Sequence, residues 1–374
     1  MAEPLAPRLP TRIPSLDGLR AVSILLVIFA HAASTHGAPA FFDRPMFTSL
    51  GNVGVRFFFI ISGFLITALL LRDFDRYGNI RLKTFYGRRT LRILPAAFFY
   101  IATMWVLYLA GILDLRFHLE SRTQASTAIP DLIHALTFTA NYQHDYNWYY
   151  NHLWSLSVEE QFYILWPFVL FFFGVRRGLW SVAAVMILAP VVRLLMYRYG
   201  GGPEIALSRE FQAVADALGT GCLTALLHNR LSHTVWAAHL RKPHTVVVAA
   251  ALIALGYGAV YVARPLAYIV GQTLANVGIA ILLQHLVRAP EGWAGRLMNT
   301  RLLSSIGVLS YSLYLWQQPF LNFHSTNWVS AFPQNIVFAV AAALASYTFV
   351  ERPFLILKDR WQARDATLKK RAAG

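Results

Sequence analysis

The sequence predicts an all-α integral membrane protein of about ten transmembrane helices, with one re-entrant or interfacial segment and both termini in the cytoplasm. Three observations predict this fold class: the composition, the lengths of the apolar runs and the distribution of basic residues. Of the 374 residues, 56% are hydrophobic and 14% are charged, whereas a soluble domain carries about 25% charged residues. A chain with so few charged residues does not have enough polar groups to cover its surface. We therefore expect lipid to surround much of that surface.

The apolar runs place the predicted helices along the chain. Each has close to the ~20 residues that a helix needs to cross the core of a bilayer. The runs are 18–36, 53–71, 91–112, 152–174, 179–198, 209–228, 244–262, 268–287, 302–322 and 333–351. Segment 131–147 is apolar only in its first half. We interpret it as re-entrant or interfacial, because irregular backbone is tolerated at membrane depth only where protein or water satisfies it.

The basic residues predict the orientation. With the N-terminus inside, the loops and tails on the cytoplasmic side contain 25 of the 33 lysines and arginines. Basic residues collect on that side of membrane proteins, so the asymmetry predicts two cytoplasmic termini. The net charge of +15 therefore reflects topology, and no nucleic-acid partner is predicted. The single cysteine, Cys222, excludes a disulfide framework and a cysteine-based metal site, and no metal is predicted.

Two ionisable residues lie deep inside predicted spans, where such groups usually mark function. His31 is about 21 Å from the inner face of the first span, and Glu159 is about 10 Å below the outer face of the fourth. In a core about 30 Å thick, both reach the outer half. This placement favours His31 as a general base oriented or charge-balanced by Glu159. The alternative is structural, with His31 as an interhelical hydrogen-bonding residue and Glu159 as a paired carboxylate.

An arginine cluster is predicted at the opposite, cytoplasmic side. Arg20 precedes His31 by eleven residues and projects from nearly the same helix face. Arg89 and Arg92 are three residues apart, hence neighbours on one helix face. Two or three guanidinium groups together suit a polyanion such as a phosphate. The alternative is that these arginines only enforce topology and bind lipid headgroups.

Two further residues are open to more than one interpretation. Arg56 lies near the outer end of the second span, where it either stabilises a developing oxyanion, binds an acceptor or pairs with Glu159. Glu160 follows Ser157 by three residues, the spacing of a capping box, and is predicted to cap its helix.

At these residues the sequence resembles the membrane-bound acyltransferase-3 family. The ordered set of motifs is far more specific than any one of them and covers residues 15 to 354. The matching stretches are Ser15–Arg20 with His31, Gly54–Leu65, the arginine-rich 85–95, Asn151–Tyr163, Ser310–Trp316 and Glu351–Phe354. The resemblance implies a cytoplasmic N-terminal tail at 1–14, a transmembrane acyltransferase domain at 15–354 and a basic cytoplasmic tail at 355–374.

The resemblance also implies a reaction. Family members pass an acyl group, usually acetyl from cytoplasmic acetyl-CoA, to a hydroxyl of an extracytoplasmic glycan, sugar or lipid. His31 would be the essential histidine, acting as a base or as a transient acyl carrier. Arg89 and Arg92, with Arg20, would hold the CoA nucleotide. Glu159 falls with Trp154 and Ser155 in the family's most recognisable outer-side motif, and we predict that Trp154 and Ser155 bind substrate.

The sequence departs from the family pattern in one span. Many members carry histidine after the Tyr-Leu-Trp of the late span, whereas Gln317 and Gln318 follow Trp316 here. We therefore expect Gln317 to bind substrate and not to transfer protons. Many relatives also carry a C-terminal esterase-like domain that receives the acyl group. The chain ends at Gly374, so we expect transfer directly to the acceptor or to a separate partner.

Together these features predict an O-acyltransferase of the bacterial cytoplasmic membrane, with acyl-CoA as donor substrate and no permanently bound cofactor. The expected partners are acyl-CoA, an extracytoplasmic saccharide or lipid-linked acceptor, and the bilayer. The alternative is a transporter or flippase for a polar or lipid-linked solute, with the buried charges along its path. Neither an inverted repeat nor a matched pair of Gly/Pro-broken spans is evident in the sequence.

Overall fold

The computed structural model describes residues 13–118, 125, 127–200 and 204–373, and each secondary-structure element named within them is helical. Most of the predicted tail at 1–14 lies outside these residues. The long helices are α1 (Pro14–Ala32), α3 (Leu50–Tyr77), α4 (Leu82–Leu109), α7 (Leu153–Tyr199), α8 (Phe211–Leu231), α10 (His244–Gly258), α12 (Gln272–Arg288), α14 (Arg301–Phe320), α15 (Gln334–Ser346) and α16 (Arg352–Ala373). The shorter ones are α2 (Pro45–Thr48), α5 (Ile129–Leu136), α6 (Trp148–Asn151), α9 (Val235–Leu240), α11 (Arg264–Leu266) and α13 (Trp293–Met298).

Seven helical stretches of the described chain are long and apolar enough to cross a membrane. They confirm a membrane-type helical fold. One of them, Trp148–Tyr199, has 52 residues and is interrupted at Gly174, whose φ of 72° lies in the left-handed region that glycine adopts readily. It covers the predicted spans 152–174 and 179–198. α8 and α14, which cover two more predicted spans, are not among the seven, so the count of ten stays a prediction.

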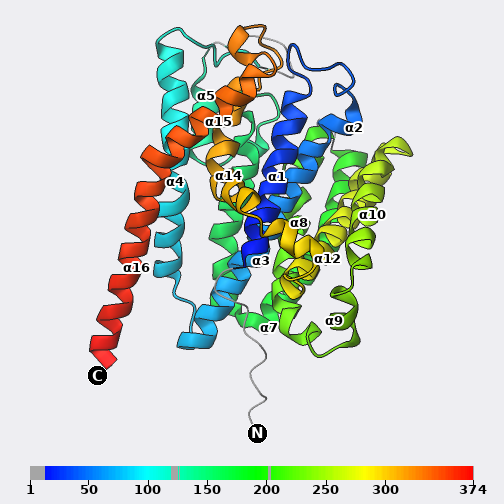
Figure 1. Cartoon of the computed structure of the whole chain (residues 1–374), viewed down its shortest axis with the longest axis vertical. Coiled ribbons are helices and arrows are strands. Elements are labelled where there is room, and N and C mark those ends of the chain that lie inside the picture. Colours follow the sequence, from blue (N-terminus) through cyan, green and yellow to red (C-terminus); the bar gives the residue numbers. More distant parts are fainter. Residues whose placement is uncertain (1–12, 119–124, 126, 201–203, 374) are drawn as a thin grey trace.

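The ends of the described chain lie on one side of the molecule. α1 begins and α16 ends toward the lower end of Figure 1, whereas α2 and α5 lie toward the upper end. α15 and α16 form one long rod beside α4 (Figure 1). α16 continues through residue 354 without a break, so no change of secondary structure marks the predicted start of the C-terminal tail.

The centre of the bundle is built around α1, which packs between α3 and α14. α3 in turn packs closely on α8 because glycines occupy their contact. A Cβ at Gly63 would clash with the backbone of Leu218, and one at Gly221 would clash with the backbone of Ile60. Small residues let helix backbones approach in this way in membrane proteins. α3 and α8 thereby pack closely together beside α1.

The segment at 131–147 folds into the protein as short helical pieces and loops. Asp131 and Asn147 are 1% and 0% exposed, so their polar groups need partners inside the protein. The Asn147 amide donates to Asp131 at 2.6 Å, Gln143 also donates to Asp131, and His118 contacts the same carboxylate at 3.1 Å. Side chains of the segment and its neighbours thus satisfy one another, while the re-entrant or interfacial placement stays a prediction.

Candidate functional site

The predicted arginine cluster is assembled in a narrow cavity that we call the Arg20 cavity. It has a volume of about 90 Å³ and lies between α1, α3, α4, α7 and α14. Its polar lining consists of Arg20, Ser62, Arg89, Arg92, Glu159, Tyr163, Ser310, Tyr311 and Tyr314. The prediction that Arg20 joins the two arginines of α4 is therefore met by the geometry. Three guanidinium groups face one carboxylate in this lining, while Asp17, Glu160 and Glu351 interact with the same arginines from outside the lining.

Glu159 belongs to this cavity. Its carboxylate accepts from the Tyr163 hydroxyl at 2.7 Å and from Ser62 Oγ at 3.0 Å. The Arg89 guanidinium lies 4.9 Å from the centroid of the Tyr163 ring, within the range of a cation–π contact. Tyr163 follows Glu159 by one helical turn on α7, so both project toward α3 and α4. The acid is thus fixed among the arginines.

His31 lines a second and wider space, the His31 cavity. Part of its lining belongs to α2, which lies toward the upper end of Figure 1. The volume of the cavity is about 630 Å³. It is lined by the end of α1, the following loop, α2, α6 and two later segments: Ala30, His31, Ser34, Asp43, Arg44, Pro45, Thr48, Tyr146, Trp148, Asn151, Arg209, Phe323 and His324. Most of this lining comes from loops and short helices, which leave more room than packed long helices do.

A chain of amides fixes the orientation of the His31 ring. Its Nδ1 lies 2.7 Å from Gln317 Oε1, while the Gln317 amide nitrogen donates to Gln318 Oε1 at 3.0 Å. The Gln318 amide nitrogen donates in turn to the Trp148 carbonyl at 2.8 Å. Because the Gln317 nitrogen is engaged as a donor, its oxygen accepts from His31 Nδ1–H. The neutral ring therefore keeps a free electron pair on Nε2, the arrangement of a general base.

Gln317 consequently has a different place from the one the sequence suggests. It is 0% exposed and contacts His31. It does not line the His31 cavity. Its role in the structure is to hold the histidine, which is the task that sequence reasoning gave to Glu159.

His31 and Glu159 lie at different levels, which corrects the expectation that they share one depth. The His31 and Trp148 rings are 5.7 Å apart, so α6 starts at the level of His31. Glu159 follows Trp148 by eleven residues, which comprise α6, the turn at His152 and the start of α7, or about 16 Å at the helical rise of about 1.5 Å per residue. Arg20 precedes His31 by the same number on α1, which runs the other way. Glu159 is therefore level with Arg20, and the two line the same cavity. The prediction placed residue 152 at the outer face of the membrane. In the structure the segment before α7 folds into the protein, so α7 starts deeper than that.

The other residues of the α7 motif lie between and beside the two cavities. Ser155 Oγ and the Tyr314 hydroxyl are 2.5 Å apart, and the Tyr314 hydroxyl also donates to the His152 carbonyl at 2.8 Å. Ser155 is buried and lines neither the Arg20 nor the His31 cavity. The Arg209 guanidinium lies over the Trp154 ring, 5.5 Å from the centroid of that ring. The structure thus gives these predicted substrate-binding neighbours different surroundings: Ser155 contacts Tyr314 of α14, and Trp154 contacts Phe59 of α3.

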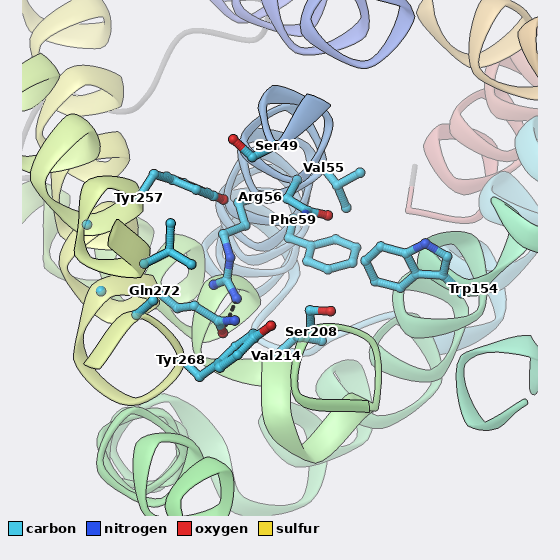
Figure 2. Close-up of a pocket in the computed structure, with 15 residues that line it drawn as sticks. Ser49, Val55, Arg56, Phe59, Trp154, Ser208, Val214, Tyr257, Tyr268 and Gln272 are labelled. Atoms are coloured by element: carbon cyan, nitrogen blue, oxygen red, sulfur yellow. Dashed lines mark hydrogen bonds between the residues drawn. The ribbon is translucent and has the colours of Figure 1, made fainter. Parts of the chain in front are cut away.

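Arg56 lies in a third space, the Arg56 cavity, shown in Figure 2. Its guanidinium donates to Asn276 Oδ1 at 3.0 Å and to Gln272, and it lies 3.8 Å from the Asp216 carboxylate. The predicted alternative of an Arg56–Glu159 pair is therefore wrong, because Asp216 of α8 is the carboxylate beside Arg56. Trp154 lines the same cavity.

Glu160 does not cap its helix, contrary to the capping-box prediction. α7 starts at Leu153, and Ser157 Oγ donates to the Leu153 carbonyl at 2.9 Å, so Ser157 lies inside the helix. One carboxylate oxygen of Glu160 is buried without a hydrogen-bond partner in the described structure. The capping pattern misled because the helix extends one turn further toward the N-terminus.

Four residues of the site were not predicted from the sequence. Tyr163 was accessible to reasoning, since it lies one turn after Glu159. Asp216 is a carboxylate inside a predicted span, which is the same signal of function that Glu159 carries. Trp148 and Gln318 had no such signal, because their role depends on contacts between residues 170 positions apart in the chain. Within the described residues no group of three or more His, Cys, Asp or Glu side chains could hold a metal ion.

Comparison with known proteins identifies relatives along nearly the whole chain. A family model described as an acyltransferase domain matches residues 13–350. The putative peptidoglycan O-acetyltransferase YrhL of Bacillus subtilis is 29% identical over 386 residues, which cover 91% of this chain and 54% of the relative. No solved structure matches the chain.

Two staphylococcal proteins are similar to the same extent. The putative O-acetyltransferase SACOL0978 of Staphylococcus aureus (strain COL) is 28% identical over 376 residues, covering 91% of this chain and 57% of the relative. The O-acetyltransferase OatA of Staphylococcus aureus (strain NCTC 8325 / PS 47) is 27% identical over 377 residues, covering 92% and 57%. The chain thus spans about half the length of the curated relatives it matches.

Proposed function

Because the chain belongs to the acyltransferase-3 family, we propose that it is a transmembrane O-acyltransferase. In this proposal it moves an acyl group, acetyl in the first instance, from cytoplasmic acyl-CoA to a hydroxyl group. The hydroxyl belongs to an extracytoplasmic saccharide or lipid-linked saccharide. This proposal includes about ten spans, two cytoplasmic termini and a place in the bacterial cytoplasmic membrane. The names of the relatives, one of them a putative peptidoglycan O-acetyltransferase, support the acetyl group and a saccharide acceptor.

The donor occupies the Arg20 cavity in this proposal. Arg20, Arg89 and Arg92 would bind the CoA phosphates, because guanidinium groups form paired hydrogen bonds with phosphate oxygens. Glu159 and Tyr163 would hold the arginines apart and in place. The pantetheine arm would extend along α1 and bring the thioester toward His31, about 16 Å from Arg20 along the helix.

The chemistry takes place at His31. The acceptor hydroxyl enters the His31 cavity and gives its proton to Nε2 as its oxygen attacks the thioester carbonyl. The new C–O bond forms, the C–S bond breaks, and the thiolate of CoA takes the proton from the imidazolium. Gln317 keeps Nδ1 protonated throughout, so that Nε2 is the basic nitrogen. One observation carries the proposal: a histidine with an amide-fixed tautomer opens into a wide cavity, three helical turns from a cluster of three arginines.

The decisive experiment follows the donor and the chemistry separately. Purified protein in mild detergent is titrated with acetyl-CoA while the melting temperature is recorded, since a ligand that binds only the folded state raises it. We expect a rise in the wild type and in His31→Ala at the same concentrations of acetyl-CoA, and in Arg89→Ala only at concentrations roughly 10–100-fold higher. Arg296→Ala is the matched control, because Arg296 is an exposed arginine of α13 outside the cavity.

Acetyl transfer is measured on the same preparations, with saccharide acceptors in reconstituted vesicles and slow acetyl-CoA hydrolysis in detergent as readouts. We expect His31→Ala to bind donor and to lose both activities. If the wild type shows no stabilisation by acetyl-CoA, CoA or longer acyl-CoAs, the CoA-dependent reaction is wrong and a transporter function takes its place. If His31→Ala transfers acyl groups at the wild-type rate, the assignment of the base is wrong.

A further inference from the structure

The Arg56 cavity is separate from the two spaces that the proposed reaction uses. It has a volume of about 150 Å³ and shares no lining residue with the Arg20 or His31 cavity. Its walls come from the start of α3, from α7, α8, α10 and α12, and from the segment before α8. In Figure 2 the Arg56 side chain extends into the middle of the lining residues, with the hydroxyl of Tyr257 pointing toward it.

The charges around Arg56 do not balance. Arg56 and Arg193 are both buried, and within the described chain both form their ion pairs with the same residue, Asp216. Arg193 takes the closer position, with Nη2 at 2.9 Å from Asp216 Oδ2. Arg56 lies 3.8 Å from Oδ1, too far for a hydrogen bond. Two guanidinium groups therefore share one carboxylate, and Arg56 is the one left facing the cavity.

A surplus buried charge is costly unless an opposite charge approaches it. The remaining partners of Arg56 are the side-chain oxygens of Asn276 and Gln272. Neutral amides orient a guanidinium but do not neutralise it. An anionic group in the cavity would complete the balance, and a guanidinium suits a carboxylate or phosphate oxygen pair.

The walls of the cavity suit a ring bearing such a group. Phe59, Trp154 and Tyr268 line it together with Gln272 and Ser208. Aromatic side chains offer apolar faces to the C–H faces of a sugar, and the amide and hydroxyl offer hydrogen bonds to its oxygens. Trp154 also connects the two sites: Arg209, whose guanidinium lies 5.5 Å from the Trp154 ring centroid, lines the His31 cavity.

We propose that the Arg56 cavity binds one anionic group, a carboxylate or a phosphate, next to the acceptor end of the active site. The group is carried either by the acceptor saccharide or by the headgroup of an anionic lipid. This assignment rests on the proposed acyl transfer and adds a charge requirement to it. An acceptor held here by its anionic group would place a neighbouring sugar beyond Trp154, toward His31.

The first test uses the wild-type protein and matched probes. In detergent, the melting temperature is followed while methyl β-D-glucuronide or methyl β-D-glucoside is added; the two sugars differ only in the carboxylate. A second pair, short-chain phosphatidylglycerol and the diacylglycerol of the same chain length, differs in the presence of the phosphate-bearing headgroup. We expect stabilisation by the anionic member of one pair, with an apparent affinity at least ten times that of its neutral partner.

The second test removes the cation. Arg56→Gln keeps a side chain that can contact Asn276 and leaves Arg193 and Asp216 as a balanced pair. We expect it to lose the preference for the anionic probe and to melt, without ligand, at the wild-type temperature or above. Arg264→Gln is the matched control, because it removes the same charge from an exposed arginine next to the cavity, paired with Glu204. We expect it to bind the probes within twofold of the wild type.

The outcomes distinguish a saccharide from a lipid headgroup as the carrier of the anionic group. They also test the anion site separately from the proposed acyl transfer. A preference for glucuronide that depends on Arg56 supports the saccharide as the source, and an Arg56-dependent preference for phosphatidylglycerol supports the lipid headgroup. Equal binding of the charged and neutral members of both pairs by the wild type overturns the anion site, whatever the variant does. Stabilisation by acetyl-CoA with no anion preference overturns only this inference. An anion preference without any effect of acyl-CoA leaves the site standing and overturns the proposed reaction.

Discussion

The Arg20 and His31 cavities differ in what builds them. Every residue that lines the Arg20 cavity comes from a long helix, and the space measures about 90 Å³. The His31 cavity is lined mostly by loops and short helices and measures about 630 Å³. Both are reached from α1, by residues eleven positions apart. The helix α1 fixes the distance between the two cavities. Long helices pack around the narrow cavity, whereas loops and short helices surround the wide one.

This difference suits one ligand whose structure is always the same and a second ligand whose structure can vary. A cavity walled by packed helices is rigid and suits one invariant group, such as the phosphates of a nucleotide. A cavity walled by loops tolerates change without disturbing the core, so its shape can follow the acceptor. The comparison therefore predicts that changes in the narrow cavity alter donor binding, whereas changes at the wide one alter the chemistry or the acceptor.

The largest effect is expected from His31→Ala. Loss of a positioned general base slows a reaction by about 10²–10⁴-fold, and the rate of acetyl transfer should fall in that range. The Michaelis constant for acetyl-CoA should stay the same, because the Arg20 cavity is intact. Transfer assays in vesicles measure both quantities, and a selective rise in the donor constant would contradict the separation of the two levels.

A smaller effect is expected from Arg89→Ala. Hydrogen bonds to charged groups contribute about 1.5–3 kcal/mol, so the donor constant should rise roughly 10–100-fold, since each 1.4 kcal/mol is about tenfold. Turnover at saturating acetyl-CoA should change little. The same substitution at Arg296, exposed on α13, serves as the control. Equal losses in the two variants would mean that only the overall basic charge matters.

Gln317→Leu tests the amide chain at the wide cavity. Leucine fills similar space and removes the acceptor for His31 Nδ1–H, so the ring no longer has one preferred tautomer. We expect turnover to fall about fivefold, in line with the ~1 kcal/mol of a typical hydrogen bond, with the donor constant unchanged. A conservative Gln317→Asn variant should recover part of the loss. A rise in the donor constant alone would mean that Gln317 serves the other cavity.

The smallest effect is expected from Ser155→Ala. It removes the contact with the Tyr314 hydroxyl at 2.5 Å, but that hydroxyl keeps the His152 carbonyl as acceptor. The cost should be about 1 kcal/mol, seen as a drop of about 1–2 °C in melting temperature, because chains of 150–250 residues lose about 2–4 °C per kcal/mol and longer chains lose less. A large loss of donor affinity would instead place Ser155 in the binding path.

The main difference between the sequence-based predictions and the structure concerns which side chains contact one another. Sequence reasoning identified Arg20, Arg89 and Arg92 as one cluster, and the structure brings them together because helical spacing and topology are local properties of the chain. It paired Glu159 with His31, and the structure pairs Glu159 with Ser62 and Tyr163. The error came from taking residue 152 as the surface of the membrane, when the preceding segment is folded into the protein.

The sequence by itself determined the helical fold class, the family and the residues with costly buried charge. These follow from composition, apolar run length and ordered motifs, each readable from neighbours in the chain. Only the tertiary structure decided that Gln317 holds His31, across 286 residues of sequence, and that Asp216 lies beside both Arg56 and Arg193. A buried polar group takes the partner that the packing of distant helices brings within about 3 Å, and the depth at which each helix starts is set by that packing.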